Sequence, residues 1–271
     1  ISKLIDFYNT WYVPNNMAIC LSGDFDPDEM LAIIEKYFGQ MEPNKDLPEL
    51  KFETASVIES PMSKDVYGLD AENIMIGWKY PGAGTHEAMV ADVVSYILSN
   101  GSAGLIDLNL NQQQKVLGAQ AMSYTRPDAG EFIIMANPKH GQSLDEVKDL
   151  ILAEIAKLRS GDFDESLLTG TINNLKLQMM NLMEENSDRA DLYVQSFING
   201  TDWADEVKRI DNLGKISKQD VIDWACKYLA DNNYAVVYKR QGEDRTAETF
   251  GNTGLSLYER KLSPYLWYGF L

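Results

Sequence analysis

The sequence predicts an α+β fold in which a mostly antiparallel sheet carries its helices on one face. Two observations support this fold class. One helix–turn–strand pattern occurs twice, at Ile5–Leu21 and at Ile222–Tyr238. Between the two copies, the hydrophobic pattern runs strand, two helices, hairpin, helices and strand, an order typical of α+β domains.

The two copies of the pattern align without gaps. Their identical positions pair Ile5, Asp6, Asn15, Asn16 and Ala18 with Ile222, Asp223, Asn232, Asn233 and Ala235. Each copy combines a short amphipathic helix, an Asn-Asn turn and an apolar strand, and asparagine tolerates the left-handed backbone that such a turn can require. Helix–turn–strand units resemble one another in general, but the identical spacing favours a duplication.

A duplication of this length predicts how the chain is organised. The first copy is expected to close an earlier unit that lies mostly before residue 1, so that the chain is a fragment of a longer protein. We expect residues 1–40 to be the C-terminal part of a preceding homologous domain and 41–64 to be a linker with room for one extended edge segment. Residues 65–242 are then expected to form a complete non-catalytic α+β domain, and 243–271 a linker or terminal extension.

Capping signals define the elements before the linker. Residues 1–12 are predicted to be a helix and 17–22 a strand. A capping box at Asp26 and Glu29, with Pro27 at the first helical position, opens a helix that ends at Gly39. Prolines and weak periodicity predict the linker that follows.

The central domain begins with a strand at 73–80 and a helix that Thr85 can cap. A break at 100–102 precedes a second helix, which is predicted to continue to about Leu117. A hairpin is expected at 120–125 and 131–137. Its alternating apolar residues indicate that one face of the sheet is buried.

The remaining elements are mostly helical. Ser143 and Glu146 form a capping box for one helix, and Asp162 and Glu165 are predicted to form another box that opens a long helix. More helices follow to about Leu229, and the closing strand is predicted at Tyr234–Lys239.

The charge of the chain excludes some classes of partner. The net charge is -17, with 41 acidic and 24 basic residues, which argues against a nucleic-acid binder and against docking to an anionic membrane. A solvated acidic surface explains this charge, and a field that attracts basic peptides or a cation is the alternative. No apolar stretch approaches the roughly 18 residues of a membrane-spanning helix.

The sequence contains no complete catalytic centre. Its cysteines, Cys20 and Cys226, read as small core residues, and His86 and His140 as ordinary surface or capping residues. HExxH and its inverse HxxEH are both absent, as are GxSxG, the P-loop and a dinucleotide-binding GxGxxG. A catalytic zinc typically needs three protein ligands, and these histidines do not supply them.

One segment nevertheless resembles a known family. The run from Phe7 to Met17, FYNTWYVPNNM, precedes a strand, then Gly23-Asp24, then a helix that ends Tyr37-Phe38-Gly39. This order is similar to that of the pitrilysin/insulinase-type zinc metallopeptidases, where it closes the first of several duplicated α+β domains. The resemblance covers about residues 1–242 and includes the glycine-containing break at 98–105.

The resemblance implies zinc-dependent hydrolysis of peptide bonds inside a closed chamber made by two bowl-shaped halves. In the family, zinc sits on an inverse HxxEH helix of the first domain, which here would lie before residue 1. The implied cofactor is therefore a zinc ion bound outside this chain. The implied partners are a peptide substrate, the missing N-terminal catalytic domain, and a second half or subunit.

The family also uses an arginine and a tyrosine of a later domain, in the context L-R-x(5)-G-Y, to hold the substrate and stabilise the transition state. Here the arginine position holds Asn111 or Gln112, and the tyrosine position holds Ala119. This departure suggests either the second domain of a four-domain member or a degenerate non-catalytic subunit. On the neighbouring hairpin, Tyr124 and Arg126 are the candidate substrate-binding residues, with ordinary strand and turn positions as the alternative.

These readings lead to competing hypotheses. The chain is the part of an active zinc endopeptidase that shapes the chamber and substrate surface, or it is a non-catalytic scaffold or peptide-binding subunit of the same fold. A generic α+β binding module is a third reading, against which the repeat argues. In each case, the chain alone is predicted neither to bind stoichiometric zinc nor to cleave peptides. The resemblance favours the bacterial periplasm or cell envelope over the cytoplasm.

Overall fold

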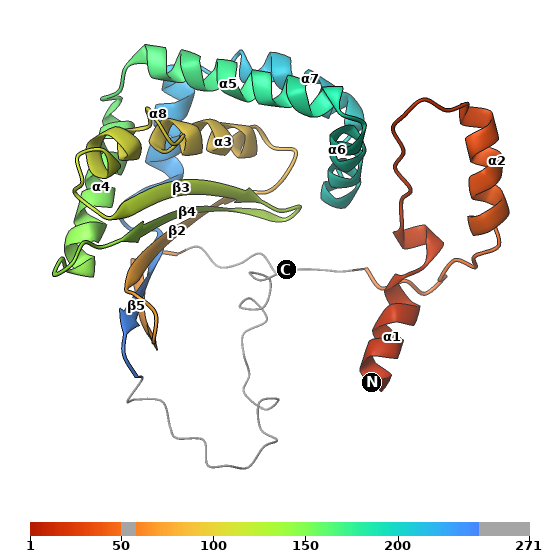
Figure 1. Ribbon diagram of the computed structural model, residues 1–271, viewed down its shortest axis with the longest axis horizontal. Coiled ribbons are helices and arrows are strands. Elements are labelled where there is room, and N and C mark those ends of the chain that lie inside the picture. Colours follow the sequence, from red (N-terminus) through yellow and green to blue (C-terminus); the bar gives the residue numbers. More distant parts are fainter. Residues whose placement is uncertain (50–57, 244–271) are drawn as a thin grey trace.

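The computed structural model describes residues 1–49 and 58–243 (Figure 1). Within them, a five-stranded sheet has the order β1-β5-β2-β4-β3. The strands are β1 (Met62–Gly68), β2 (Asn73–Pro81), β3 (Gly118–Thr125), β4 (Ala129–Asn137) and β5 (Tyr234–Gln241). The β1–β5 pair is parallel, and the pairs β2–β5, β2–β4 and β3–β4 are antiparallel. The predicted α+β class with a mostly antiparallel sheet is confirmed.

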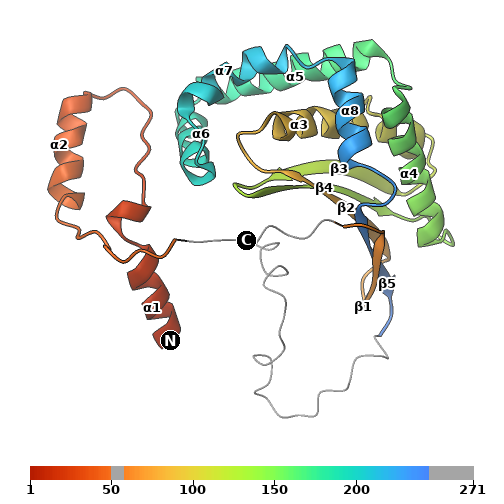
Figure 2. The same cartoon turned by 180° about the vertical axis from the view of Figure 1, so that it is seen from behind.

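The helices of this domain lie in two layers on one side of the sheet. Helices α3, α4 and α8 contact the strands, and α5 and α7 lie over α3 on the side away from the sheet (Figures 1 and 2). Their bounds are α3 (His86–Leu98), α4 (Leu144–Ser160), α5 (Glu165–Glu184), α6 (Asn186–Asn199), α7 (Trp203–Leu213) and α8 (Lys218–Tyr228).

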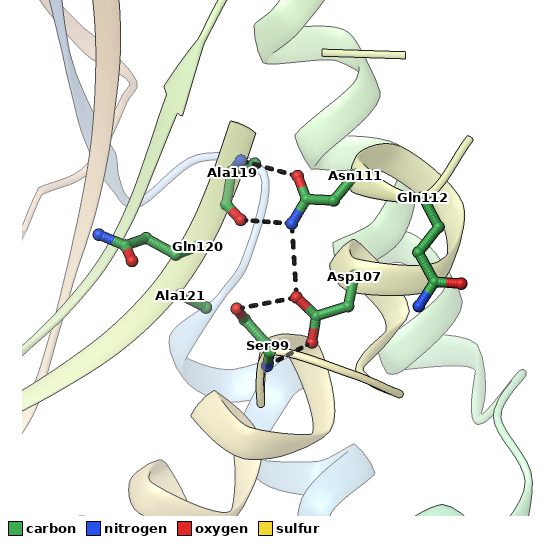
Figure 3. Close-up of a pocket in the computed structure, with 8 residues that line it drawn as sticks. Ser99, Asp107, Asn111, Gln112, Ala119, Gln120 and Ala121 are labelled. Carbon is green, nitrogen blue, oxygen red and sulfur yellow. Dashed lines mark hydrogen bonds between the residues drawn. The ribbon is translucent and has the colours of Figure 1, made fainter. Parts of the chain in front are cut away.

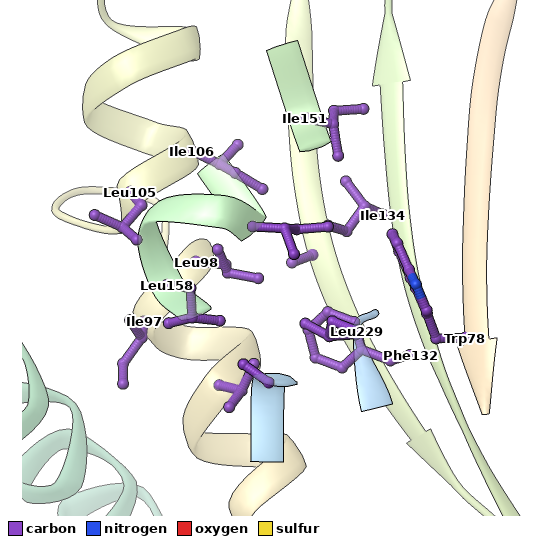
Figure 4. Close-up of a cluster of buried hydrophobic side chains, with 14 of the residues drawn as sticks. Trp78, Ile97, Leu98, Leu105, Ile106, Phe132, Ile134, Ile151, Leu158 and Leu229 are labelled. Atoms are coloured by element: carbon purple, nitrogen blue, oxygen red, sulfur yellow. The ribbon is translucent and has the colours of Figure 1, made fainter. Parts of the chain in front are cut away.

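The core fills the space between the sheet and its inner helices. Alternate side chains of a strand point to opposite faces, so β2 and β4 present one apolar set to the helices. Trp78 and Phe132 are almost fully buried and belong to the same hydrophobic cluster as Leu98 of α3 and Leu158 of α4 (Figure 4). Burial of such side chains is worth about 2 kcal/mol each, which makes this layer the main source of stability.

Helix starts in the domain follow the capping rules, with one correction. The Ser143–Glu146 capping box at α4 is confirmed, and the Thr85 hydroxyl accepts a hydrogen bond from the Ala88 N–H at 3.1 Å. The predicted box at Asp162 and Glu165 is wrong. The helix α5 is capped by Asp164, whose carboxylate accepts from the Ser166 N–H at 2.7 Å, because Gly161 ends α4 in a left-handed conformation just before it.

The helix predicted to run to about Leu117 is also shorter than expected. Its helical turns end with a π-helical segment, η2 (Asp107–Asn111), after which Gln114 has a φ of 50°. Leu117 is exposed, and its N–H donates to the Asn137 carbonyl. The backbone has therefore already turned into the hairpin, and β3 begins at Gly118.

The segment before the central domain differs from that domain because its helices are not buried. It contains α1 (Ser2–Trp11), a 3₁₀ turn η1 (Pro14–Asn16) and α2 (Pro27–Phe38), as predicted, but neither α helix has a buried residue. Residues 17–22, predicted as a strand, pair with no strand of the described chain. Met17 is nevertheless extended, with φ -130° and ψ 151°, so the backbone has strand conformation without a sheet to join.

The boundaries of the predicted domains remain predictions. The strand β1 crosses the expected boundary between 64 and 65, and the sheet thus takes up the last residues of the expected linker. Residues 50–57 of that linker, and all but the first residue of the expected 243–271 extension, lie outside the described residues.

Candidate functional site

The sheet has a second face, opposite its helices, on which an apolar surface lies. Register places Met135, Met75 and Val237 in one row across β4, β2 and β5. The next row contains Met122, Ile133, Gly77 and Ala235, from β3, β4, β2 and β5. All of these residues are half-buried, and we call this surface the open sheet face.

The end of the open sheet face toward the β3–β4 turn is polar. There Tyr124, Glu131 and Lys79 form a row across three strands, and all are exposed. The Tyr124 hydroxyl donates to the Met122 sulfur at 3.2 Å, which lays the ring along the strand toward the apolar rows. The face thus combines adaptable apolar side chains with one exposed aromatic residue.

Arg126, the other candidate, lies in the turn that joins β3 to β4. Its backbone N–H donates to the Ala129 carbonyl and its own carbonyl accepts from the Ala83 N–H, both at 2.9 Å. The structure therefore places Arg126 and Tyr124 at the same end of the hairpin. A substrate-binding role for either residue remains a proposal.

Asn111 and Ala119, at the positions where the resemblance expects the arginine and the tyrosine, are joined to each other by hydrogen bonds. The Asn111 side chain accepts from the Ala119 N–H and donates to the Ala119 carbonyl, each at 2.8 Å (Figure 3). This amide pairs with the edge of β3 as a neighbouring strand would. Gln112 is exposed and donates instead to the Ser102 carbonyl.

Asp107 lies next to this pair and is buried. Its carboxylate accepts from the backbone N–H groups of Asn100, Gly101 and Gly104, at 2.8, 2.8 and 3.2 Å. The cavity beside it, about 400 Å³, is lined by these same loop and strand residues. A buried carboxylate that accepts several N–H groups holds the loop together and has little capacity left for a substrate.

This network was not predicted from the sequence. The usable signal was the spacing of Asp107 and Asn111, which places the two polar side chains on one side of a helical turn. The structure also explains Gly104, because a Cβ atom there would lie 2.5 Å from the Leu98 carbonyl oxygen. In the glycine-containing break at 98–105, the backbone wraps around the Asp107 carboxylate.

A larger groove, of about 1080 Å³, lies between α3 and the helices α5 to α7. In it, the Asp92 carboxylate forms an ion pair with Arg209 and accepts from the Ser123 hydroxyl at 2.7 Å. Nearby, burial raises the pKa of Tyr80 to about 12, and its hydroxyl shares a hydrogen bond with Thr125. The Asp92 contacts link α3 to α7 and to β3. The polar side chains named here thus form hydrogen bonds or an ion pair with one another.

Neither histidine belongs to a metal site in the described part of the chain. His86 is the first residue of α3, as predicted, and His140 lies in the turn before α4. Across residues 1–49 and 58–243, no group of three or more His, Cys, Asp or Glu side chains is placed to hold a metal ion. No helix among the same residues is long and apolar enough to cross a membrane.

Comparison with known proteins agrees with the resemblance. Residues 1–175 match the family model described as "Peptidase M16 inactive domain". A zinc protease, PqqE, from Helicobacter pylori is 24% identical over 247 residues, which are 86% of this chain and 53% of that protein. The chain thus spans about half the length of this curated relative.

Solved structures share the fold. A protease from Helicobacter pylori has a TM-score of 0.83 at 17% identity, covering 89% of this chain and 59% of that one. The periplasmic protease PqqL from Escherichia coli has a TM-score of 0.68 at 16% identity, covering 88% of this chain and 28% of that one. With the family model matched over more than half of the chain, the chain belongs to the M16 peptidase family, as a part that corresponds to its inactive domain.

Proposed function

We propose that this chain is the non-metal-binding part of a zinc-dependent metalloendopeptidase, and that its open sheet face forms one wall of a closed chamber in which peptides are degraded. The observation that carries the proposal is the asymmetry of the sheet. Helices cover one face, and the other presents half-buried apolar rows that end at Tyr124. Zinc would be held by residues outside this chain.

The chemistry of the open sheet face suits an unfolded peptide. Methionine side chains bend to fit different apolar partners, so the face can hold many sequences. Tyr124 adds a rigid ring with a polar tip, and Arg126 stands close by in the sequence. The net charge of -17 would favour peptides with basic residues.

A second candidate function is a non-catalytic scaffold or peptide-binding subunit of the same fold. The Asn111–Ala119 pair favours it, because these residues bond to each other where the family's substrate-holding pair is expected. The two functions share the open sheet face and differ in whether the upstream sequence supplies HxxEH. A bacterial periplasmic or cell-envelope location is proposed for both.

Substitution on the open sheet face tests the proposal. In the protein that includes the residues encoded upstream of Ile1, Tyr124→Ser is expected to raise KM for a quenched-fluorescence peptide about 5-fold, which corresponds to ~1 kcal/mol, with kcat little changed. Leu177→Ser on α5 is the control, since its side chain is similarly exposed and α5 lies over α3 on the side away from the sheet.

The outcomes separate the two functions. If the protein cleaves the peptide and Tyr124→Ser changes neither KM nor kcat, the open sheet face is not the substrate wall. If the protein does not cleave, the fluorescence anisotropy of a labelled peptide decides, because a peptide-binding subunit still binds it and Tyr124→Ser weakens that binding.

A further inference from the structure

Gly77 lies in the middle of β2, and the fold does not require a glycine at this position. Its φ is not positive, and the register of β2 with β4 and with β5 runs through it without a bulge. Apart from its neighbours in the chain, a Cβ atom here would meet only the Phe132 carbonyl oxygen, at 4.0 Å, which is an ordinary contact. Glycine in the interior of a strand costs conformational entropy, and it often marks a place where a ligand approaches the backbone closely.

Two other glycines of the sheet region differ from Gly77 because packing explains them. A Cβ atom at Gly130, in β4, would overlap the Tyr80 ring, and one at Gly82, just after β2, would lie 2.5 Å from the Pro127 carbonyl oxygen. Any side chain at these two positions would force the structure to shift. At Gly77 a side chain fits, so the reason for glycine lies on the surface of the sheet and not in its packing.

The missing side chain of Gly77 interrupts an apolar row of the open sheet face. By register, the row runs through Met122, Ile133, Gly77, Ala235 and Met62, on β3, β4, β2, β5 and β1. Only a bare backbone and the Ala235 methyl group stand between the larger side chains of Ile133 and Met62. Because neighbouring strands are about 4.8 Å apart, three strand spacings separate these two residues by roughly 14 Å. We call the stretch of the row at Gly77 and Ala235 the Gly77 gap.

The residues around the Gly77 gap are mostly apolar. Met75 and Val237 lie in the neighbouring row on β2 and β5, and both are half-buried. On the other side, Lys79 is two residues further along β2 and is exposed. A side chain that enters the gap therefore loses water against apolar groups and meets a charge at one end only. This favours an uncharged, apolar side chain, since burying a charge without a partner is unfavourable.

We propose that the Gly77 gap is a specificity-determining site that accepts one bulky apolar side chain, such as leucine or phenylalanine, from a peptide on the open sheet face. The inference rests on the proposed function, because it needs a peptide on that face. The side chain of the peptide would fill the row between Ile133 and Met62. A β-branched residue such as valine would suit the middle of a strand better than glycine, so a sequence selected for stability alone would close the gap.

A comparison of variants and peptides tests the proposal on the protein that includes the residues encoded upstream of Ile1. The probes are peptides of one host sequence in which a single leucine, at each position in turn, replaces alanine. The measured quantity is KM for quenched-fluorescence peptides if the protein cleaves them, and Kd from fluorescence anisotropy if it does not. The parent is expected to prefer leucine over alanine about 10-fold at one position. Gly77→Val, which fills the gap, should reduce this preference to about 2-fold and leave the value for the alanine peptide unchanged.

Gly170→Val is the matched control, because Gly170 also has open space around its Cβ position but lies on α5, away from the sheet. It should keep the full preference for leucine. The Tm of Gly77→Val should be equal to or above that of the parent, which shows that any loss of preference does not come from unfolding.

The possible outcomes separate this inference from the proposed function. An unchanged leucine preference in Gly77→Val would overturn the inference alone if Tyr124→Ser still weakens peptide binding. Equal weakening of the leucine and alanine peptides by Gly77→Val would also overturn it, because the gap would then contact the peptide backbone and not a side chain. If the parent binds none of the peptides, both the inference and the proposed function are wrong.

Discussion

The two ends of this molecule hold the same helix–turn–strand unit in different surroundings. At the C-terminal end, α8 and β5 are built into the sheet and the core. At the N-terminal end, α1 is closed by the equivalent asparagine hydrogen bond, and neither α1 nor residues 17–22 contain a buried residue. Local signals such as the asparagine turn therefore specify the unit, while its burial depends on the domain it joins.

The largest expected effect comes from the aligned pair Trp224 and Phe7. Trp224→Ala should lower the free energy of unfolding by about 4 kcal/mol, because it removes a buried ring and the hydrogen bond from its indole N–H to the Glu87 carbonyl. Phe7→Ala in the same 271-residue chain should change it by less than about 0.5 kcal/mol. Urea unfolding measures both, and equal losses would break the comparison.

The second largest expected effect on unfolding comes from Asp107, a buried carboxylate within the domain. Asp107→Ala should cost about 3 kcal/mol in urea unfolding, because it leaves the N–H groups of Asn100, Gly101 and Gly104 without their acceptor. Gln112→Ala, at an exposed neighbouring position, should stay within about 0.5 kcal/mol of the parent. A cost at Asp107 no greater than that at Gln112 would show that the carboxylate does not hold the loop.

The repeated turn gives a smaller contrast. Asn233→Ala removes the hydrogen bond to the Tyr228 carbonyl and should cost about 1 kcal/mol. Asn16→Ala removes the equivalent bond to Trp11 but should leave the unfolding of the chain unchanged, since α1 is not packed on the domain core. Thermal unfolding of both variants, followed by circular dichroism, provides the comparison.

The smallest effect concerns pH. Hydrogen bonds from Lys148 and then Tyr238 hold the pKa of Asp145 below its ordinary 3.8. A lowered folded-state pKa contributes stability above the unfolded value, and this stability is lost as pH falls through the folded value. Asp145 is largely exposed, so Asp145→Asn should cost only about 0.5 kcal/mol at pH 7. Unfolding of the variant should depend less on pH below about 4 than that of the parent.

Much of the fold could be predicted because local rules decide it. The alternation of Ile74, Ile76 and Trp78 defined β2, and the Ser143–Glu146 box defined the start of α4. The cap of α5 was predicted at Asp162 but is Asp164, which stands two residues later and also follows the Gly161 turn. Spacing alone did not distinguish the two carboxylates.

What could not be predicted depends on contacts between distant residues. The parallel pairing of β1 with β5 joins opposite ends of the domain. The Asn111 amide ends a helix early because Ala119 offers it both a donor and an acceptor. Residues 17–22 have a strand's sequence, but a strand also needs neighbours, and the described chain gives these residues none.

Zinc content tests the central claim most directly, namely that this chain is the non-metal-binding part of a zinc peptidase. Metal analysis is made on the purified 271-residue chain and on the protein that includes its upstream residues, after equal exposure to zinc and dialysis. About one zinc per molecule is expected in the extended protein and none at stoichiometric level in the chain alone. Stoichiometric zinc on the chain alone, or none on either protein, would contradict the account.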